Sequence, residues 1–292
     1  MRIVGHQNQR KTLGQIARRE MIPQSYLFTG PNEVGKRQVA LEFAFRLIGG
    51  SRIPDGELQH PDIRMVEPVF EERSGQVKKK QIAVADIRQA LLFLSRFPTL
   101  GKRRVVIVDA AEELSIGGQN ALLKVLEEPN TTSILILVTA QPGRLLPTLL
   151  SRLVTFTFDP VPPSELEEFF ADQPRLPAPF FFLLGLPGFI TKALQNPETF
   201  QRHQQRLSQL FQISNLSLRA RIQLAEELSD DQAMLPVLLE EWLSGLHVQF
   251  LKDPARFQRR LFLLERILTG NRAITLRQGS ARLLLEKLFL AL

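Results

Sequence analysis

A glycine-rich loop between a β-prone run and a helix-forming run is the feature that most constrains this chain. Residues 30–37 read GPNEVGKR, follow the apolar run 26–29 and open a helical pattern that continues to residue 47. Glycines let backbone N–H groups close around phosphate oxygens, and a lysine beside the second glycine reaches the terminal phosphates. The pattern predicts a phosphate-binding loop, with Gly30, Gly35 and Lys36 as candidate nucleotide-binding residues.

Strand-like and helix-like segments alternate through residues 1–159. The apolar runs 105–108 and 134–138 are typical of strands buried on both faces, and amphipathic helical patterns separate them. This alternation predicts an α/β domain with a parallel sheet wrapped by helices. Residues 160–179 hold six prolines, which indicates a boundary, and from about residue 203 the pattern is helical.

The parts needed for nucleotide hydrolysis are incomplete. A buried strand ends in Asp109, where a metal-binding carboxylate belongs, but Arg37 stands where a Ser or Thr hydroxyl would ligate Mg²⁺. A water-activating glutamate would follow Asp109, and Ala110 follows instead. The next acids, Glu112 and Glu113, lie too far along the chain to substitute simply. We therefore expect no hydrolysis, while ATP binding without hydrolysis remains open.

Composition excludes several classes of site. The chain has no cysteine, so disulfides, thiolate zinc sites and cysteine nucleophiles are ruled out, and its four histidines are far apart. No apolar run approaches the roughly 18 residues that a membrane helix needs. The first residues do not resemble a signal peptide, so we expect a cytoplasmic protein without a membrane partner. A net charge of +7 fits nucleic acid or an acidic partner without proving either.

Ordered sequence blocks over about residues 1–160 resemble the δ′ branch of the clamp-loader AAA+ family. The blocks are IVGHQ at 3–7, SYLFTGP at 25–31, HPD at 60–62, NALLKVLEEP at 120–129 and LPTLLSR at 146–152. Each block is weak by itself, but their order and spacing together are specific. The carboxy-terminal part resembles the family only loosely, as a helical domain.

The resemblance implies three domains: an AAA+ nucleotide-fold domain at 1–159, a small helical lid at 160–206 and an all-α collar at 207–292. It implies a non-hydrolysing stator subunit of the DNA polymerase III clamp loader, which helps load the sliding clamp on primer–template DNA. The expected partners are the γ/τ and δ subunits and, through the complex, the clamp and the DNA.

The same resemblance assigns roles to single residues. Arg152 would act in trans as an arginine finger on the ATP of a neighbouring subunit. Thr139 falls at the first sensor position, and Gly188 stands near the place of a sensor arginine in active loaders. Many relatives carry a four-cysteine zinc module that is missing here, so we expect no zinc and no required cofactor.

Two other functions compete with this interpretation. An active γ/τ-like ATPase is disfavoured by Arg37, Ala110 and Gly188. A stand-alone DNA-binding module is allowed by the charge but leaves the ordered blocks unexplained. The basic clusters 78–80 and 102–104 are either phosphate contacts or solvated loops, and residues 71–81 are expected to form an exposed loop.

Overall fold

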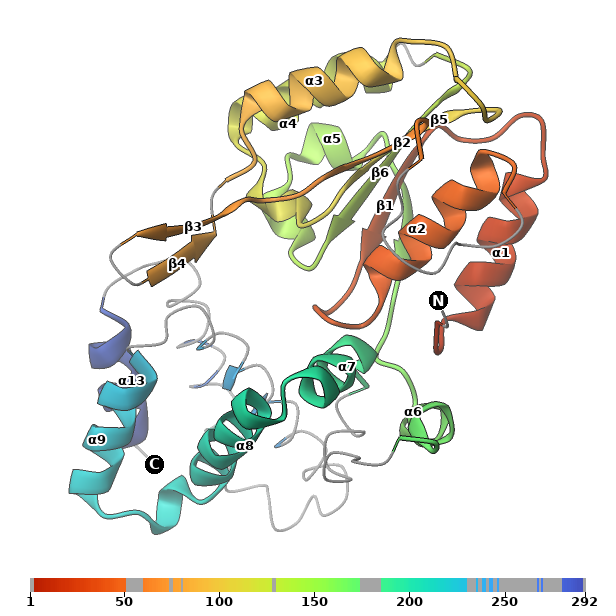
Figure 1. Cartoon of the computed structure of the whole chain (residues 1–292). Coiled ribbons are helices and arrows are strands. Elements are labelled where there is room, and N and C mark those ends of the chain that lie inside the picture. The colour runs from red at the N-terminus through yellow and green to blue at the C-terminus, as the bar shows by residue number, and fades with distance from the viewer. Residues whose placement is uncertain are drawn as a thin grey trace. The chain divides into compact units, whose positions relative to one another are not determined.

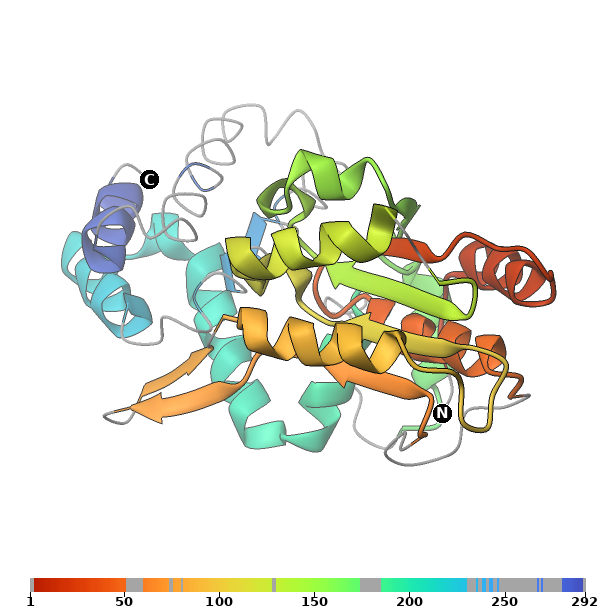
Figure 2. The same cartoon turned by 90° about the horizontal axis from the view of Figure 1, so that it is seen from above.

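A computed structural model of the chain (Figures 1 and 2) separates it into two compact units. Unit 1 consists of Met1–Phe169 and Gly185–Gly188, and unit 2 consists of Phe170–Leu184 and Phe189–Leu292. The structure describes residues 3–50, 60–73, 76–79, 81–127, 130–173, 185–229, 235, 238–239, 242–243, 246, 267, 269 and 280–290. The three-domain division at residues 159 and 206 stays a prediction.

The centre of unit 1 is a five-stranded sheet in the order β2-β5-β6-β1-β7, with every neighbouring pair parallel. Parallel strands bring their carboxyl ends to one edge, so the residues that follow the strands gather there. This confirms the predicted α/β fold with a parallel sheet. The strands are β1 (Ser25–Thr29), β2 (Ile63–Val66), β5 (Arg104–Val108), β6 (Ser133–Thr139) and β7 (Val154–Thr157).

Helices cover both faces of this sheet (Figures 1 and 2). Val105 and Ile107 of β5 pack into the hydrophobic cluster that includes α2, whereas Val106 and Val108 pack into the cluster that includes α3. The strands are therefore apolar on both faces, as their continuous apolar runs predict. The covering helices are α1 (Gln7–Ala17) and α2 (Lys36–Leu47) on one face, and α3 (Val84–Leu94), α4 (Ile116–Glu127) and α5 (Pro147–Leu150) on the other.

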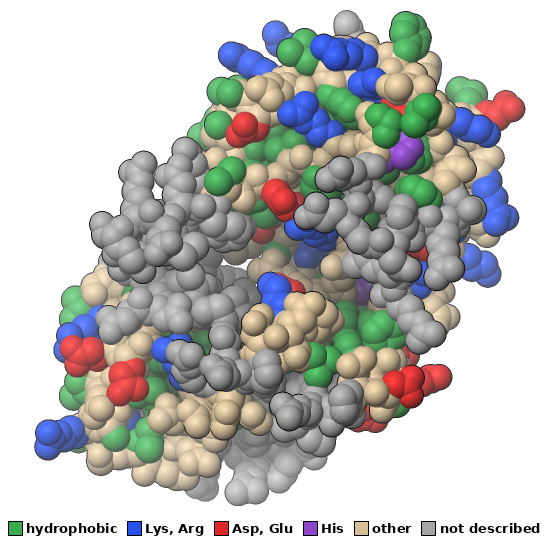
Figure 3. All heavy atoms as spheres, viewed as in Figure 1, with side chains coloured by type: hydrophobic (Ala, Val, Ile, Leu, Met, Phe, Trp, Pro, Cys, Tyr) green, Lys and Arg blue, Asp and Glu red, His purple; other side chains and the backbone are tan. Residues whose placement is uncertain are grey.

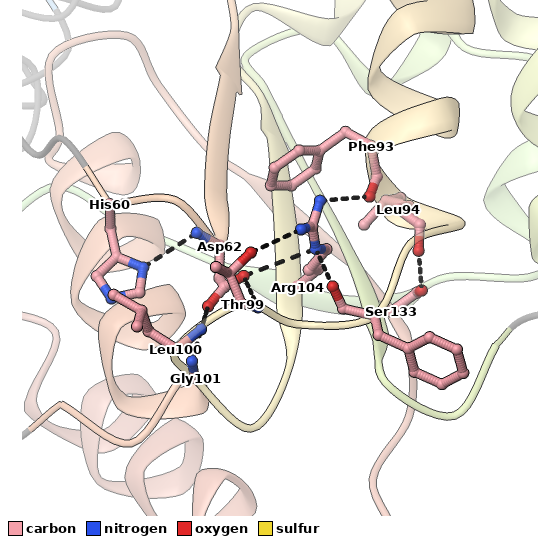
Figure 4. A network of polar contacts seen from close by, with 10 residues as sticks. His60, Asp62, Phe93, Leu94, Thr99, Leu100, Gly101, Arg104 and Ser133 are labelled. Atoms are coloured by element: carbon pink, nitrogen blue, oxygen red, sulfur yellow. Dashed lines mark hydrogen bonds and ion pairs between the residues drawn. The ribbon is translucent and has the colours of Figure 1, made fainter.

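A buried polar network fixes the amino-terminal edge of the sheet (Figure 4). The Asp62 carboxylate, which is fully buried, accepts hydrogen bonds from the backbone N–H groups of Thr99 (2.6 Å), Leu100 (2.8 Å) and Gly101 (2.7 Å). The Nε atom of Arg104 lies 3.6 Å from this carboxylate. The last residue of the HPD block thus ties the start of β2 to the turn that leads into β5.

The basic cluster 102–104 is largely part of this internal structure. Arg104 is buried, donates Nε–H to the Phe97 carbonyl (2.8 Å), and lies over the Phe93 ring at 4.5 Å. The Arg103 guanidinium donates to the carbonyls of Arg19 (3.1 Å) and Glu20 (2.9 Å) just after α1. The prediction of a solvated or DNA-facing cluster is wrong for Arg104, because its buried guanidinium donates hydrogen bonds to acceptors of the protein itself.

Residues 70–73 and 76–79 pair as two antiparallel strands that project from the sheet, rather than forming the expected loop (Figure 1). The strands are β3 (Phe70–Arg73) and β4 (Gln76–Lys79), and Glu72 is paired with Val77. The backbone pairing converts part of the predicted loop 71–81 into regular structure.

The described residues of unit 2 are mostly helical. In α9 (Leu218–Ser229), the Arg221 guanidinium donates to the carbonyl of Phe289 in α13 (Ala281–Leu290) at 3.2 Å. Trp242 is buried, and the centroid of its ring lies 6.3 Å from that of the Phe289 ring. The other regular helices after the sheet are α6 (Pro163–Phe170), α7 (Pro187–Gln195) and α8 (Pro197–Phe211). The helical pattern expected from about residue 203 falls partly outside the described residues.

Candidate nucleotide site

The loop at residues 30–36 lies at the carboxyl edge of the sheet, between β1 and α2. Gly30 has φ 149°, and a Cβ atom there would lie 2.2 Å from the Phe158 carbonyl oxygen. Gly35 has φ 110° and caps α2. Both positions require glycine, since side chains are strained at these angles. The shape of the loop therefore follows from the two glycines that the sequence motif supplies.

The loop lysine is turned back onto its own loop. Lys36 is buried, and its Nζ atom donates to the carbonyl oxygens of Gly30 (2.7 Å) and Pro31 (2.6 Å). An ammonium group has three donors, and at least two of them are engaged by the loop itself. In this conformation the charge that would meet a terminal phosphate stabilises the loop instead.

The magnesium position is lined by an arginine and two carboxylates. Arg37 Nη1 lies 2.7 Å from Glu67 Oε2 and 3.5 Å from Asp109 Oδ2. Glu67 follows β2 and Asp109 follows β5, and these two strands are paired in parallel. A guanidinium carries no lone pair for a cation, so these residues do not fit a bound Mg²⁺.

The surroundings of Asp109 raise the pKa of its carboxyl group above the ordinary value. Burial raises the pKa of the Asp109 carboxyl, and the nearby carboxylates of Glu67 and Glu112 raise it further. The Arg37 charge and the backbone N–H of Ala110 act in the opposite direction without cancelling the rise. Arg37 is thus the cation that keeps this carboxylate ionised more readily than burial alone would allow.

Glu112 belongs to this edge, although its distance along the chain from Asp109 argues against it. Ala110 adopts φ 51°, and the 3₁₀ turn Ala111–Glu113 that comes next brings Glu112 back to the strand ends. The hydroxyl of Thr139, the last residue of β6, donates to Glu112 Oε2 at 2.7 Å, and both side chains are buried. The contact between Thr139 and Glu112 depends on this short turn, and the spacing of residues in the sequence does not predict it.

Gly188 packs directly on the loop. Its backbone N–H donates to the Glu33 carbonyl at 2.8 Å. A Cβ atom on Gly188 would lie 2.9 Å from that oxygen and 2.5 Å from Glu33 Oε2. A side chain at this position would have to displace the loop, so the structure leaves no room for the sensor arginine that the resemblance places near Gly188 in active loaders.

Arg152 makes different contacts from the loop residues. It follows α5, its side chain is 37% exposed, and it donates to the Thr148 carbonyl (2.8 Å) and to Glu127 Oε1 (3.0 Å). The structure therefore brings Gly30, Gly35, Lys36, Asp109 and Thr139 to one edge of the sheet, while Arg152 pairs with α4.

Wider features of the described residues bear on the site. No group of three or more His, Asp or Glu side chains in the part of the chain that the structure describes is arranged to hold a metal ion. None of the helices among those residues is long and apolar enough to cross a membrane.

A parallel α/β sheet with a G-x₄-G-K loop, an acid after β5 and a polar residue ending β6 defines a nucleotide-fold domain of the AAA+ type. Residues 5–162 match the model of the family described as DNA polymerase III, delta subunit, which is more than half of the chain, and the chain belongs to this family. Within it, the chain is similar to the subunits named delta′ of DNA polymerase III.

Curated relatives support this assignment. The chain is 34% identical over 152 residues to the DNA polymerase III subunit delta′ of Pseudomonas aeruginosa, covering 48% of this chain and 44% of that protein. It is 29% identical over 198 residues to the subunit delta′ of Bacillus subtilis, covering 63% and 57%. The chain thus spans about half the length of the curated relatives it matches.

A solved structure agrees in fold. A DNA polymerase III gamma subunit-related protein from Thermotoga maritima is 18% identical, with a TM-score of 0.50 over 97% of this chain and 98% of that one. At this identity the likeness shows the fold alone.

Proposed function

We propose that this chain is a non-hydrolysing subunit of the DNA polymerase III clamp loader that acts as a stator while a sliding clamp is placed on primed DNA. The observation that carries the proposal is the position of Arg37, whose guanidinium lies between Glu67 and Asp109 where an active site needs Mg²⁺. Phosphoryl transfer depends on that metal to neutralise charge on the β and γ phosphates.

Three further features support the absence of hydrolysis. Ala110 replaces the base, the Glu112 carboxylate is engaged by the Thr139 hydroxyl, and Gly188 leaves no room for a sensor arginine. No cofactor is required in this proposal. A nucleotide held by Gly30, Gly35 and a reoriented Lys36 would remain bound without being hydrolysed.

In this proposal Arg152 acts in trans as an arginine finger on the ATP of a neighbouring subunit. Its guanidinium is partly exposed and is held by a hydrogen bond to the Thr148 carbonyl and by a surface ion pair to Glu127, and such a pair is worth about 0–1 kcal/mol. A neighbouring subunit's ATP, with several negative charges, would compete easily for it. An arginine finger of this kind raises phosphoryl-transfer rates by ~10³–10⁵.

The partners follow from the family and are part of the proposal. We expect assembly with γ/τ and δ subunits, and contact with the clamp and with primer–template DNA through the complex. Residues 160–206 would serve as a helical lid, and residues 207–292 would serve as a collar for assembly.

The test is the DNA-stimulated ATPase of a loader assembled from this chain and γ/τ and δ subunits. Arg152→Ala should lower the turnover of the site it serves by ~10³ or more. Its unfolding free energy should change by about 1 kcal/mol or less, because both lost contacts, the ion pair to Glu127 and the hydrogen bond to the Thr148 carbonyl, are solvent-exposed. Unchanged ATPase in a fully assembled complex would refute the role of Arg152.

Arg144→Ala is a matched control for that experiment. Its side chain is 40% exposed against 37% for Arg152, it belongs to the same unit, and it also makes one ion pair, to Glu113 at 3.5 Å. Its substitution should leave the ATPase unchanged. A similar fall in both variants would show a general effect of lost positive charge.

The two rival functions are tested on the isolated chain. An active motor would hydrolyse ATP without partners, which Arg37 and Gly188 oppose. On the face of unit 1 visible in Figure 3, the Lys and Arg side chains of the described residues are scattered instead of gathering into one basic patch. This distribution gives a stand-alone DNA-binding module no support on that face.

A further inference from the structure

We propose that Arg37 is a built-in replacement for the magnesium ion, so that the positive charge between the two carboxylates of this site comes from the protein itself and divalent cations are rejected. The idea concerns the isolated chain and does not depend on Arg152 or on partner subunits. It goes beyond the loss of hydrolysis, because it assigns an occupant to the metal position and predicts that removing this occupant lets a metal ion bind.

The carboxylates come together because of the sheet. β2 and β5 are paired with Val66 opposite Val108, and the backbone N–H of Asp109 donates to the Val66 carbonyl at 2.9 Å. Glu67 and Asp109 therefore leave neighbouring strands at the same level. Two such carboxylates repel each other unless a positive charge lies between them.

Arg37 provides that positive charge from the first turn of α2. It is the second residue of α2, next to Lys36, so the loop that fixes the helix start also fixes the arginine. A single atom, Nη1, lies 2.7 Å from Glu67 and 3.5 Å from Asp109. A divalent cation in the same position would have to displace a permanently charged group, and like charges would oppose its approach.

The loop itself is closed from within. Lys36 Nζ donates to the carbonyls of Gly30 and Pro31, and the Gly188 N–H donates to the carbonyl of Glu33. These hydrogen bonds do not involve Arg37. Like the Arg37 ion pairs, they engage the site with groups of the protein itself. The loop is held in its folded shape by protein groups, where an active relative would use the phosphates and the metal.

Removal of Arg37 should reveal the metal site. Mg²⁺ in proteins is often held by one or two carboxylates and several waters, and Glu67 and Asp109 would offer that arrangement once the guanidinium is gone. Arg37→Thr also restores the hydroxyl of an active loop.

The experiment is thermal unfolding of the full chain without nucleotide, in EDTA and in millimolar MgCl₂. Arg37→Thr should lower the Tm in EDTA by about 2–4 °C and regain at least half of that loss with Mg²⁺. Wild type should show no Mg²⁺-dependent shift beyond that of the control, and Arg37→Thr combined with Asp109→Asn should lose the response.

Arg46→Thr is the control, because Arg46 lies on the same helix, is 40% exposed against 44% for Arg37, and pairs with Glu42 at 2.6 Å. Its Tm should fall without recovery in Mg²⁺. The proposal is overturned if Arg37→Thr responds to Mg²⁺ no more than this control does, or if wild type is stabilised as much as Arg37→Thr.

A second measurement covers the case in which Arg37→Thr does not fold. Mn²⁺ titration of wild type and Asp109→Asn, followed by electron paramagnetic resonance, compares metal uptake with the arginine in place. Equal uptake supports the proposal, and additional uptake by wild type overturns it. Neither measurement uses ATPase activity, so failure here is distinct from failure of the proposed function.

Discussion

At the scale of single residues, the buried carboxylate of Asp62 has the best-defined electrostatic role. Burial by itself raises the pKa of an aspartate. Here the backbone N–H groups of Thr99, Gly101 and Leu100, together with Arg104, outweigh burial and hold the pKa of Asp62 below its ordinary value. The folded protein therefore stabilises the charged form of this residue.

Asp62→Asn tests that role. Since the folded-state pKa lies below the unfolded value of about 3.9, the stabilisation by the carboxylate is fully present above that value and is lost as pH falls through the folded-state pKa. We expect the variant to lose about 2–3 kcal/mol of unfolding free energy at neutral pH. The difference from wild type should shrink below about pH 4.

Denaturant unfolding over a series of pH values measures this difference. Asp86→Asn is a suitable control, because this exposed carboxylate accepts one backbone N–H, from Ala83 at 3.2 Å, and should cost about 1 kcal/mol or less. A loss for Asp62→Asn that stays constant into acid would show that shape, and not charge, causes it.

The residues of the candidate site were partly predictable. Apolar runs of the right length placed Asp109 and Thr139 after buried strands, and β5 and β6 do end at those points. The side chains that contact these residues were not predictable, because Glu67 reaches Arg37 only through the register of β2 against β5. Glu112 likewise reaches Thr139 through a turn that local spacing does not encode.

At the scale of elements, apolar periodicity predicted the strands and helices whose buried faces are rich in Val, Leu and Ile. It missed α1, because this helix reads QNQRKTLGQIA and buries only Leu13 and Gly14. It also missed the paired strands β3 and β4, whose sequences are highly charged. Elements held by backbone pairing or by polar contacts give a weak apolar signal.

The contact between the first turn of α7 and the loop leads to a prediction at this scale. Gly188→Ala would place a Cβ atom 2.9 Å from the Glu33 carbonyl oxygen and 2.5 Å from its carboxylate. The carboxylate can rotate, but the backbone oxygen must move. We expect a loss of about 1–2 kcal/mol, measured as unfolding free energy in urea.

Gly143→Ala is the matched change, because a Cβ atom at Gly143 would meet no heavy atom within 4 Å. It should be neutral or slightly stabilising, as expected when alanine restricts the unfolded chain. Equal stability of Gly188→Ala and Gly143→Ala would show that α7 does not press on the loop.

At the scale of the whole molecule, the α/β organisation of unit 1 followed from alternating patterns, and the proline-rich boundary after residue 159 lies close to the end of its first segment at Phe169. Unit boundaries were harder to predict than elements. Gly185–Gly188 returns to unit 1 after residues assigned to unit 2, a tertiary contact that composition does not report.

Charge is the remaining whole-molecule property, and it leads to the last prediction. The net charge of +7 permits DNA binding, but Arg103 and Arg104 donate to carbonyls of the protein and cannot serve fully as phosphate contacts. The isolated chain should therefore bind primed DNA only in the non-specific range, with a Kd of about 10⁻⁴–10⁻⁶ M at physiological salt and a steep salt dependence.

Fluorescence anisotropy with primed and fully duplex DNA over a range of salt concentrations measures this affinity. Lys102→Ala should weaken binding to both DNAs alike, since a phosphate contact carries no sequence preference. Nanomolar binding by the isolated chain, or strong discrimination for the primed junction, would contradict the prediction and favour a free DNA-binding module. Weak binding that becomes tight only after assembly with the proposed partner subunits would instead assign DNA recognition to the complex.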